Sequence, residues 1–305
     1  MNTSVCITTL NEEGSIGKLL DSLLVQTKRA SEIIIVDGGS SDKTLEIINH
    51  YQKKVSYIKL LKEKCTRARG RNLGVEIARN EIIAITDAGC VAHSNWLEEI
   101  TRPLICLEGV DIAAGFYRMV GEAPFQKAAA VFLGTTPDKF DNSFLPSTRS
   151  MGFRKSVWEK IGGFPEEMEN SAEDTYFNYR ALKFGVKYAR VKSAVVEWGM
   201  PESMAEFGRK ICDYAKWDAK TKIFIYPQKG LTSHNIKAFL VILRYLLGLI
   251  LLILGISQPV LLVILVILFL LYLVHAFRKA GTWGIPLQII SDIAVMSGFI
   301  SGLLK

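Results

Sequence analysis

The chain has 305 residues, of which 49% are hydrophobic and 22% are charged, and its formal net charge is +7. Its mean hydropathy of +0.22 excludes an ordinary soluble protein, and its length allows one large or two ordinary domains. The positive charge does not indicate nucleic-acid binding, because no basic stripe is interleaved with aromatic residues. Anionic lipid headgroups or diphosphate substrates explain this charge better.

The N-terminal part alternates between strand and helix patterns. Apolar runs predict strands at residues 4–9, 32–36, 55–61 and 82–87, and amphipathic or capped runs predict helices at residues 16–24, 43–51 and 66–78. Four such repeats with short loops predict a doubly wound, mostly parallel α/β sheet with right-handed crossovers. Asp42 or Ser41 is expected to cap the second helix.

Three of the expected strands end in polar groups, at residues 9–12, 37–40 and 87–89. The carboxyl ends of parallel strands meet at one edge of a sheet, which is where ligands bind in such folds. The same residue types also form ordinary strand-to-helix turns, so each turn by itself has a purely structural interpretation. No glycine-rich dinucleotide fingerprint and no phosphate-loop lysine is present, which disfavours those nucleotide-binding folds.

The C-terminal part contains long apolar runs. Residues 236–256 and 259–277 each have about the 20 apolar residues that cross a bilayer, and Arg244 is the only charged residue in either run apart from Lys237 at the start of the first. We therefore predict two transmembrane spans. A third run, residues 285–304, contains Asp292, which is costly in lipid unless it pairs with Arg244 or another group. This run could cross the membrane, pack against the other two, or lie in the interface.

The N-terminal domain is expected in the cytoplasm. Lys237, Arg278 and Lys279 flank the outer ends of the two spans, whereas the linker at 257–259 is uncharged, and positive flanks stay inside. Residues 1–10 do not resemble a signal peptide. The cysteines are odd in number and show no zinc-site spacing, so free thiols in a reducing compartment are expected: Cys6, Cys65, Cys90, Cys106 and Cys212.

The expected domain boundaries follow from these patterns. Residues 1–200 form the cytoplasmic domain, and residues 235–305 form the transmembrane region. Residues 201–234 lie between them, and 201–222 have apolar and basic positions at helical spacing, which is typical of an amphipathic helix at the membrane interface. A helix that closes over the acceptor site, or a plain core helix, also fits this pattern.

Residues 4 to about 200 resemble the family 2 glycosyltransferases of the GT-A fold, the nucleotide-diphospho-sugar transferase type, which transfer sugar from a nucleotide-sugar with inversion. The resemblance is carried by Thr8-Thr9-Leu10-Asn11-Glu12, residues 35–44, Arg71-Asn72-x-Gly74, residues 86–90, residues 161–164 and Glu173-Asp174. It implies donor contacts from these residues: Thr9, Leu10, Asn11, Glu12, Asp37, Gly39, Arg71, Asp87 and Ala88. Asp174 is implied as the catalytic base, and Glu173 and Trp198 as acceptor-side residues.

The chain departs from this family at the metal site. The family usually carries Asp-x-Asp, whose last carboxylate binds Mg²⁺ or Mn²⁺, but Gly89 stands at that position here. Asp87 is expected to hold the ion or to contact the ribose, with Glu197 or another carboxylate completing the metal site, because hard cations prefer oxygen ligands. Arg67, Arg69 and Arg71 could share in neutralising the diphosphate, or could form a solvated helix face.

The sequence therefore predicts a membrane-anchored inverting glycosyltransferase. Its donor is expected to be a UDP- or GDP-sugar, and its acceptor a polyprenyl phosphate or a lipid-linked saccharide at the cytoplasmic face. Transfer to a protein or a polysaccharide is an alternative within the same class. A catalytically silent membrane scaffold is the alternative from another class, and Gly89 is the feature that motivates it.

Overall fold

The computed structural model describes residues 1–168, 171–226 and 233–304, and these form two compact units. Unit 1 contains residues 1–119 and 135–199. Unit 2 contains the described residues of 120–134, 200–226 and 233–304. The segment 120–134 thus interrupts unit 1 in sequence but packs in unit 2. Residues 227–232, at the end of the expected interfacial segment, lie outside the described residues.

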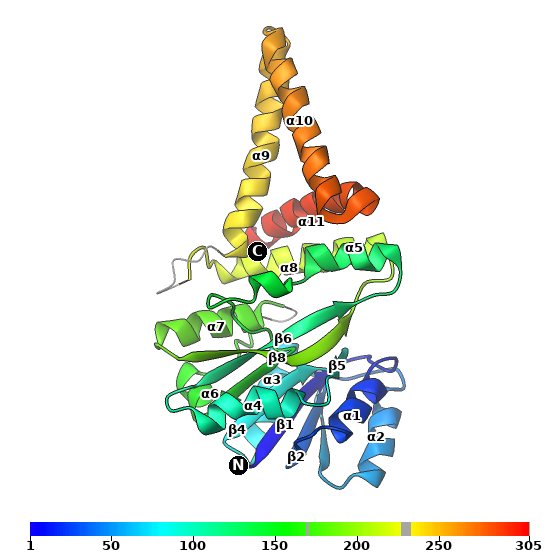
Figure 1. Ribbon diagram of the computed structural model, residues 1–305, viewed down its shortest axis with the longest axis vertical. Coiled ribbons are helices and arrows are strands. Elements are labelled where there is room, and N and C mark those ends of the chain that lie inside the picture. Colours follow the sequence, from blue (N-terminus) through cyan, green and yellow to red (C-terminus); the bar gives the residue numbers. More distant parts are fainter. Residues whose placement is uncertain (169–170, 227–232, 305) are drawn as a thin grey trace. The chain divides into compact units, whose positions relative to one another are not determined.

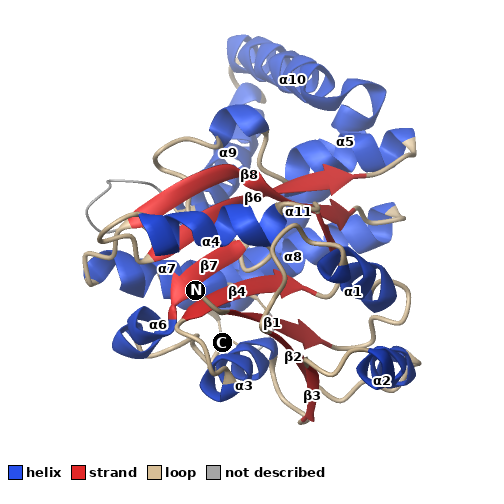
Figure 2. Cartoon of the chain, turned by 60° about the horizontal axis from the view of Figure 1, so that its bottom comes forward, coloured by secondary structure: helices blue, strands red, loops and turns tan. Residues whose placement is uncertain are grey.

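Unit 1 is built on one mixed sheet, which holds eight strands in the described part of the chain (Figure 2). In spatial order they are β3 (Ile58–Lys62), β2 (Glu32–Asp37), β1 (Thr3–Thr9), β4 (Ile82–Asp87), β7 (Met151–Arg154), β6 (Ile112–Val120), β8 (Tyr188–Gly199) and β5 (Cys90–Ala92). The first four are parallel, as predicted, whereas β7 is antiparallel to both β4 and β6. Strand β5 is antiparallel to β8.

Helices cover both faces of this sheet because neighbouring strand residues point to opposite faces. Val5 and Ile7 join one core cluster, while Cys6 between them joins the other. The first face packs against α1 (Ile16–Leu24), α2 (Thr44–Lys54) and α4 (Trp96–Cys106). The second packs against α3 (Arg67–Ile77), α6 (Lys155–Ile161) and α7 (Glu173–Lys183).

Strand β3 and helix α2 differ from their predicted bounds by one residue at one end and by three at the other. Strand β3 begins at Ile58, because Val55 caps the end of α2 and a turn follows it. Helix α2 begins at Thr44, so Lys43 takes the N-cap position. Asp42 still accepts a hydrogen bond from the Thr44 N–H at 3.0 Å, so its carboxylate satisfies a helix-start donor from one residue earlier.

Unit 2 is helical. It contains α5 (Pro124–Leu133), α8 (Met204–Thr221), α9 (His234–Gly255), α10 (Pro259–Ala280) and α11 (Gly284–Leu303). Helices α8 and α11 are in close contact, because a Cβ at Gly298 or Gly302 would lie 2.2 Å from the carbonyl oxygen of Cys212 or Lys216. The apolar face of α8 is thus covered by protein, and its location at a membrane surface stays a prediction.

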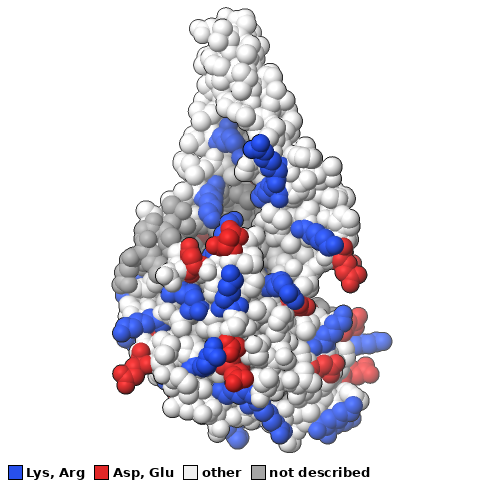
Figure 3. All heavy atoms as spheres, in the orientation of Figure 1, with Lys and Arg blue, Asp and Glu red and all other residues white. Residues whose placement is uncertain are grey.

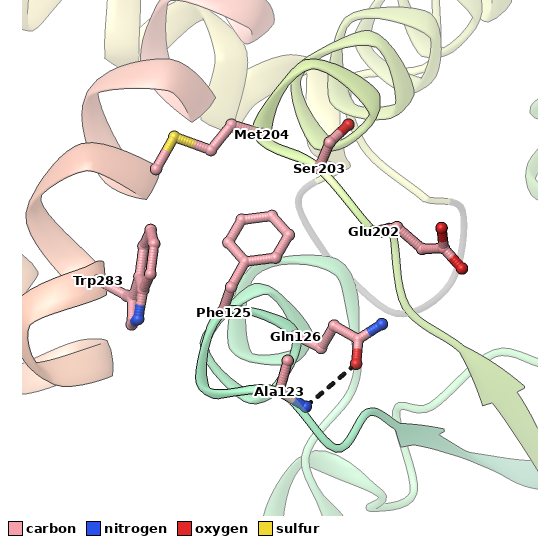
Figure 4. A pocket seen from close by; sticks show the side chains of 7 residues that line it. All are labelled: Ala123, Phe125, Gln126, Glu202, Ser203, Met204 and Trp283. Carbon is pink, nitrogen blue, oxygen red and sulfur yellow. Dashed lines mark hydrogen bonds between the residues drawn. The ribbon is translucent and has the colours of Figure 1, made fainter.

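Helices α9 and α10 form a hairpin (Figure 1). Many of its exposed side chains are apolar. Two stretches, His234–Gly255 and Pro259–Leu303, are long and apolar enough to cross a membrane, and the second combines α10 with α11. Residues 245–277 contain no Asp, Glu, Lys or Arg. The tip of the hairpin is accordingly free of charged side chains on the face drawn in Figure 3.

Asp292 on α11 is 1% exposed and is held by side chains of the hairpin. Arg244 Nη2 donates to its carboxylate at 2.5 Å, and the Tyr245 and Tyr272 hydroxyls donate at 3.1 and 2.8 Å. Gln288 Nε2 donates at 2.9 Å. Asp292 therefore has a partner, Arg244, as the sequence analysis required for this residue. Within unit 2 the third apolar run packs along α8 and is joined to α9 and α10 through this carboxylate.

Candidate functional site

The loops that follow β1 and β2 are joined by hydrogen bonds. The Asn11 N–H donates to Ser40 Oγ at 2.9 Å, and Asn11 Oδ1 accepts from the Ser41 N–H at 2.9 Å. The Glu12 N–H donates to Thr44 Oγ1 at 2.7 Å. Asn11 has a φ of 55°, a left-handed conformation that asparagine adopts more readily than most residues. Two of the three strand ends from the sequence analysis therefore form one edge that is fixed by cross-links.

Asp37 ends β2 and is 1% exposed. Its Oδ1 accepts from the N–H groups of Gly39 and Ser40 at 3.1 and 3.0 Å, and its Oδ2 accepts from the Ser40 hydroxyl at 2.5 Å. Gly39 has a φ of 105°, which favours glycine. The carboxylate thus holds its own turn, and its contact with the donor stays a prediction.

Thr9, Leu10 and Ala88 add a mixed surface to this edge. Leu10 is 53% exposed although it is apolar, whereas Ala88 is buried. Thr9 is 4% exposed, and its Oγ1 has no hydrogen-bond partner among the described residues. Since buried hydroxyls are nearly always paired, the edge has the chemistry to receive a ligand with an apolar face and a hydrogen-bonding group.

Helix α3 lies very close to the sheet because two glycines face it. A Cβ at Gly70 would lie 3.0 Å from Thr8 Cγ2, and a Cβ at Gly74 would lie 3.5 Å from Cys6 Cβ. A larger residue at position 70 would push the helix outward. The close approach places Arg71, the residue after Gly70, beside Asp87 at the end of β4.

Arg71 is 2% exposed and bridges two carboxylates. Its Nη2 donates to Asp87 Oδ1 at 2.7 Å, and its Nη1 donates to Glu173 Oε1 at the start of α7. Burial alone would raise the pKa of Asp87, but Arg71, with Arg149 and Arg67, holds that pKa below its usual value. Two predicted donor residues and one predicted acceptor-side residue therefore form one ionic group, in which Arg71 and Glu173 are buried and Asp87 is partly exposed.

Asp174, next to Glu173, has the opposite electrostatic setting. Burial raises its pKa, and the carboxylates of Glu173 and Asp87 raise it further, while Arg71 and Arg149 act in the other direction. The Asp174 side chain is only partly buried, and its Oδ1 accepts from the Thr175 N–H at 2.8 Å. A carboxylate with a raised pKa is a better proton acceptor, which suits the role of a general base.

A second carboxylate, that of Glu12, lies beside Gly89. A Cβ at Gly89 would lie 3.8 Å from both carboxylate oxygens of Glu12 and 3.9 Å from Trp198 Nε1. The Glu12 carboxylate therefore lies where a side chain at position 89 would extend. No group of three or more His, Cys, Asp or Glu residues able to hold a metal ion is found in the described part of the chain.

Glu197 belongs to another charged group. It accepts a hydrogen bond from Arg118, it lies 3.3 Å from His93 Nε2, and these contacts lower its pKa. The structure thus gives no support to the expectation that Glu197 completes a metal site with Asp87. Strand β8 points Glu197 and Trp198 to opposite faces, and the sequence alone did not show which residue faces Asp87.

The three arginines of α3 do not act together. Arg69 pairs with carboxylates on the protein surface, at 3.7 Å from Glu63 and at 3.3 Å from both Glu76 and Glu166. Arg67 is exposed, and only Arg71 is buried against Asp87. The surface interpretation of this cluster therefore fits Arg69, and the site interpretation fits Arg71.

Arg149 is a residue of the site that the sequence interpretation missed. Its guanidinium carbon lies 3.9 Å from the ring centroid of Trp198 and 5.1 Å from that of Tyr117. Its positive charge lowers the pKa values of Asp87 and Asp174. The residue lies in a loop far from the recognised motifs, so no local signal in the sequence marked it.

The known proteins that this chain resembles in sequence are described as glycosyltransferases. A family model described as Glycosyl transferase family 2 matches residues 4–162. Glycosyltransferase AglE of Haloferax volcanii is 28% identical over 189 residues, which cover 60% of this chain and 62% of AglE. The probable glycosyltransferase YdaM of Bacillus subtilis is 26% identical, and the match covers 70% of this chain and 54% of YdaM. The chain thus spans less than two thirds of each of these curated relatives.

Two solved structures share the fold. The crystal structure of S. aureus TarS 1–349 in complex with UDP has a TM-score of 0.55 at 22% identity, covering 72% of this chain and 69% of that chain. The mannosyltransferase PcManGT from Pyrobaculum calidifontis, in complex with GDP-Man and Mn²⁺, has a TM-score of 0.66 at 18% identity, covering 99% and 87%. The α/β GT-A fold expected from the motifs is thereby confirmed.

The unequal settings of Asp174 and Glu173 predict opposite effects on stability. Asp174→Asn should raise the melting temperature at pH 7, because it removes a charge that burial and Glu173 disfavour. This gain should vanish below about pH 4, where Asp174 is protonated in the folded and the unfolded chain. Glu173→Gln should lower the melting temperature, because it leaves Arg71 with one carboxylate. Thermal unfolding followed by circular dichroism measures both; a lower melting temperature for Asp174→Asn at pH 7 would contradict this electrostatic account.

Proposed function

Since this chain belongs to glycosyl transferase family 2, we propose that it transfers a sugar with inversion from a nucleotide-sugar to a lipid-linked acceptor at the cytoplasmic face of a membrane. The observation that carries the proposal is the buried bridge from Asp87 through Arg71 to Glu173, which joins the donor edge to the start of α7. Asp174 follows Glu173 directly, so this bridge connects the proposed donor-binding edge with the proposed base.

The donor would bind at the cross-linked edge. UDP in TarS and GDP-Man in PcManGT, both proteins of similar fold, support a nucleotide-sugar with uracil or guanine as its base. The exposed Leu10 offers an apolar surface to the nucleoside, and the unpaired hydroxyl of Thr9 offers a hydrogen bond. Asn11, Gly39 and Ala88 would hold the backbone of the edge in place around it.

Asp174 would serve as the general base. As the acceptor oxygen forms its bond to C1 of the sugar, the Asp174 carboxylate takes the proton of the acceptor hydroxyl, and the bond from C1 to the diphosphate oxygen breaks. The bond forms on the face opposite to the leaving group, so the configuration at C1 inverts. Arg71 balances the carboxylates of Asp87 and Glu173, which keeps their charge from raising the pKa of the base further.

A divalent cation fits the residues at Gly89. Mg²⁺ and Mn²⁺ prefer oxygen ligands, and Mg²⁺ is commonly held by one or two carboxylates together with substrate phosphates and water. Asp87 and Glu12 would supply those carboxylates, because Glu12 fills the space beside Gly89. When bound, the cation would neutralise the leaving diphosphate. The Mn²⁺ in PcManGT supports this cofactor.

The apolar hairpin supports a membrane anchor and a lipid-linked acceptor. Exposed apolar side chains cover α9 and α10, and such a surface is stable in lipid. The acceptor would be a polyprenyl phosphate or a lipid-linked saccharide, with Glu173 and Trp198 on its side of the site. Transfer to a protein or a polysaccharide would use the same chemistry. In the alternative of a catalytically silent scaffold, the protein would transfer sugar to no acceptor.

Asp174→Asn tests the enzymatic function directly. Asn keeps the shape of Asp but cannot accept a proton, so kcat should fall by a factor of about 10² to 10⁴ while donor affinity stays within a few-fold of wild type. Nucleotide release over a panel of UDP- and GDP-sugars with polyprenyl phosphate measures the rate, and calorimetry measures the affinity. The control is Glu13→Gln, which changes a carboxylate other than the proposed base. Equal rates for wild type and Asp174→Asn would falsify the base assignment, and a wild type that binds donor without turnover would favour the scaffold.

Moving the second carboxylate tests the proposed metal site. Glu12→Gln should weaken Mn²⁺ binding in the presence of UDP or GDP on the order of tenfold. Gly89→Asp in the Glu12→Gln background should restore much of that binding, because the new carboxylate occupies the same space. Free Mn²⁺ measured by electron paramagnetic resonance follows this without any turnover. Unchanged Mn²⁺ binding in Glu12→Gln would remove Glu12 from the site.

Tag placement tests the proposed topology. Reporters fused after Tyr226 and after Arg278 should both be cytoplasmic, whereas a tag between Ser257 and Pro259 should lie on the other side. The basic residues at the outer ends of the two spans and the uncharged linker between them generate this expectation. An extracytoplasmic signal from the Tyr226 fusion would overturn it.

A further inference from the structure

Arg149 is a positioned cation in a site that has an excess of carboxylates. Asp87, Glu173 and Asp174 are three carboxyl groups, and the buried Arg71 supplies one positive charge against them. A nucleotide-sugar brings a diphosphate to the same strand ends, which increases the excess. A second cation close to these carboxylates would therefore stabilise bound phosphate more than it would in water.

The position of Arg149 is set by aromatic packing. Its guanidinium carbon lies over the Trp198 ring, 3.9 Å from the centroid, and 5.1 Å from the centroid of Tyr117, and its Nη1 donates to Ser147 Oγ at 3.0 Å. Stacking uses the face of the guanidinium, so the N–H donors at its edge keep their directions. Trp198 in turn lies at the Gly89 turn, 3.9 Å from where a Cβ would be.

The neighbouring residue connects this position to the sheet. Ser150 Oγ accepts from Trp96 Nε1 at 2.9 Å and donates to the Ala194 carbonyl at 3.0 Å. Gly115 leaves room for that hydroxyl, because a Cβ there would lie 1.9 Å from Ser150 Oγ. The backbone that carries Arg149 is therefore held by β6, β8 and α4, which is the rigid support that a binding residue needs.

We propose that Arg149, stacked on Trp198, binds phosphate oxygens of a substrate at the Gly89 turn, and the proposal rests on the function proposed above. The phosphate can come from the diphosphate of the donor or from the phosphate of a lipid acceptor. A guanidinium can bind two phosphate oxygens at once, whereas a lysine ammonium acts as a point charge. An arginine over Trp198 is thus better suited to this role than a lysine would be. Its charge also lowers the pKa of Asp174, in keeping with a position beside the reacting groups.

Nucleotide binding separates the two phosphate sources. For Arg149→Gln, calorimetry with UDP, UMP, GDP and GMP should show at least a tenfold loss for the diphosphates and little loss for the monophosphates if the donor diphosphate is bound. If the acceptor phosphate is bound, nucleotide affinity should stay unchanged and KM for polyprenyl phosphate should rise at least tenfold. Arg149→Lys should recover only part of either loss, because it restores the charge without the planar fork.

Arg190→Gln is the matched control, because Arg190 also stacks on an aromatic ring, that of Tyr188 at 5.2 Å, outside the group around Asp87. Melting temperatures of both variants show whether each has folded. Trp198→Leu should reproduce part of the loss by releasing the guanidinium. Wild-type values for both nucleotide affinity and KM in Arg149→Gln would overturn this proposal and leave the enzymatic function intact. A wild type that binds no nucleoside diphosphate would overturn both.

Discussion

The buried guanidinium of Arg71 is the constraint on which the site depends. It pairs with Asp87 at the end of a central strand and with Glu173 at the start of α7, so two distant parts of the chain are joined by one side chain that is 2% exposed. A buried charge is tolerated only when it is paired, and Arg71 has two partners. The bridge exists because Gly70 and Gly74 allow α3 to lie close to the sheet.

The charge balance around this bridge separates the roles of the carboxylates. Asp87 is held ionised by the arginines, whereas Asp174, beside Glu173 and partly buried, has a raised pKa. Neighbouring carboxylates with pKa values moved in opposite directions are typical of sites that transfer protons. Glu12 lies beside the Gly89 turn and Arg149 lies over Trp198, where we propose that they act on a phosphate-bearing substrate.

In unit 2, the buried carboxylate of Asp292 is stabilised by polar side chains of the hairpin. The hairpin carries no charge between residues 245 and 277, yet Asp292 on α11 needs partners because it is buried. Arg244, Tyr245 and Tyr272 provide them, and Gly298 and Gly302 allow α11 to lie against α8. Small residues and internally paired polar groups are what packed helices in lipid require.

The sequence by itself determined the parallel first half of the sheet, the apolar helices and the edge where three strands end, because these depend on local periodicity and on turn residues. The family motifs also singled out Asp87, Arg71 and Asp174 as candidate site residues, and their roles stay predictions. Only the tertiary structure decided that β7 enters the sheet antiparallel, that Asp37 holds its own turn, and that Glu12 lies beside Gly89 while Glu197 pairs with Arg118. Arg149 was beyond the reach of any local pattern, since its partners Trp198, Asp87 and Asp174 are far away in the chain. Side-chain charges interact through space, and the distances between them are set by packing that the order of residues does not display.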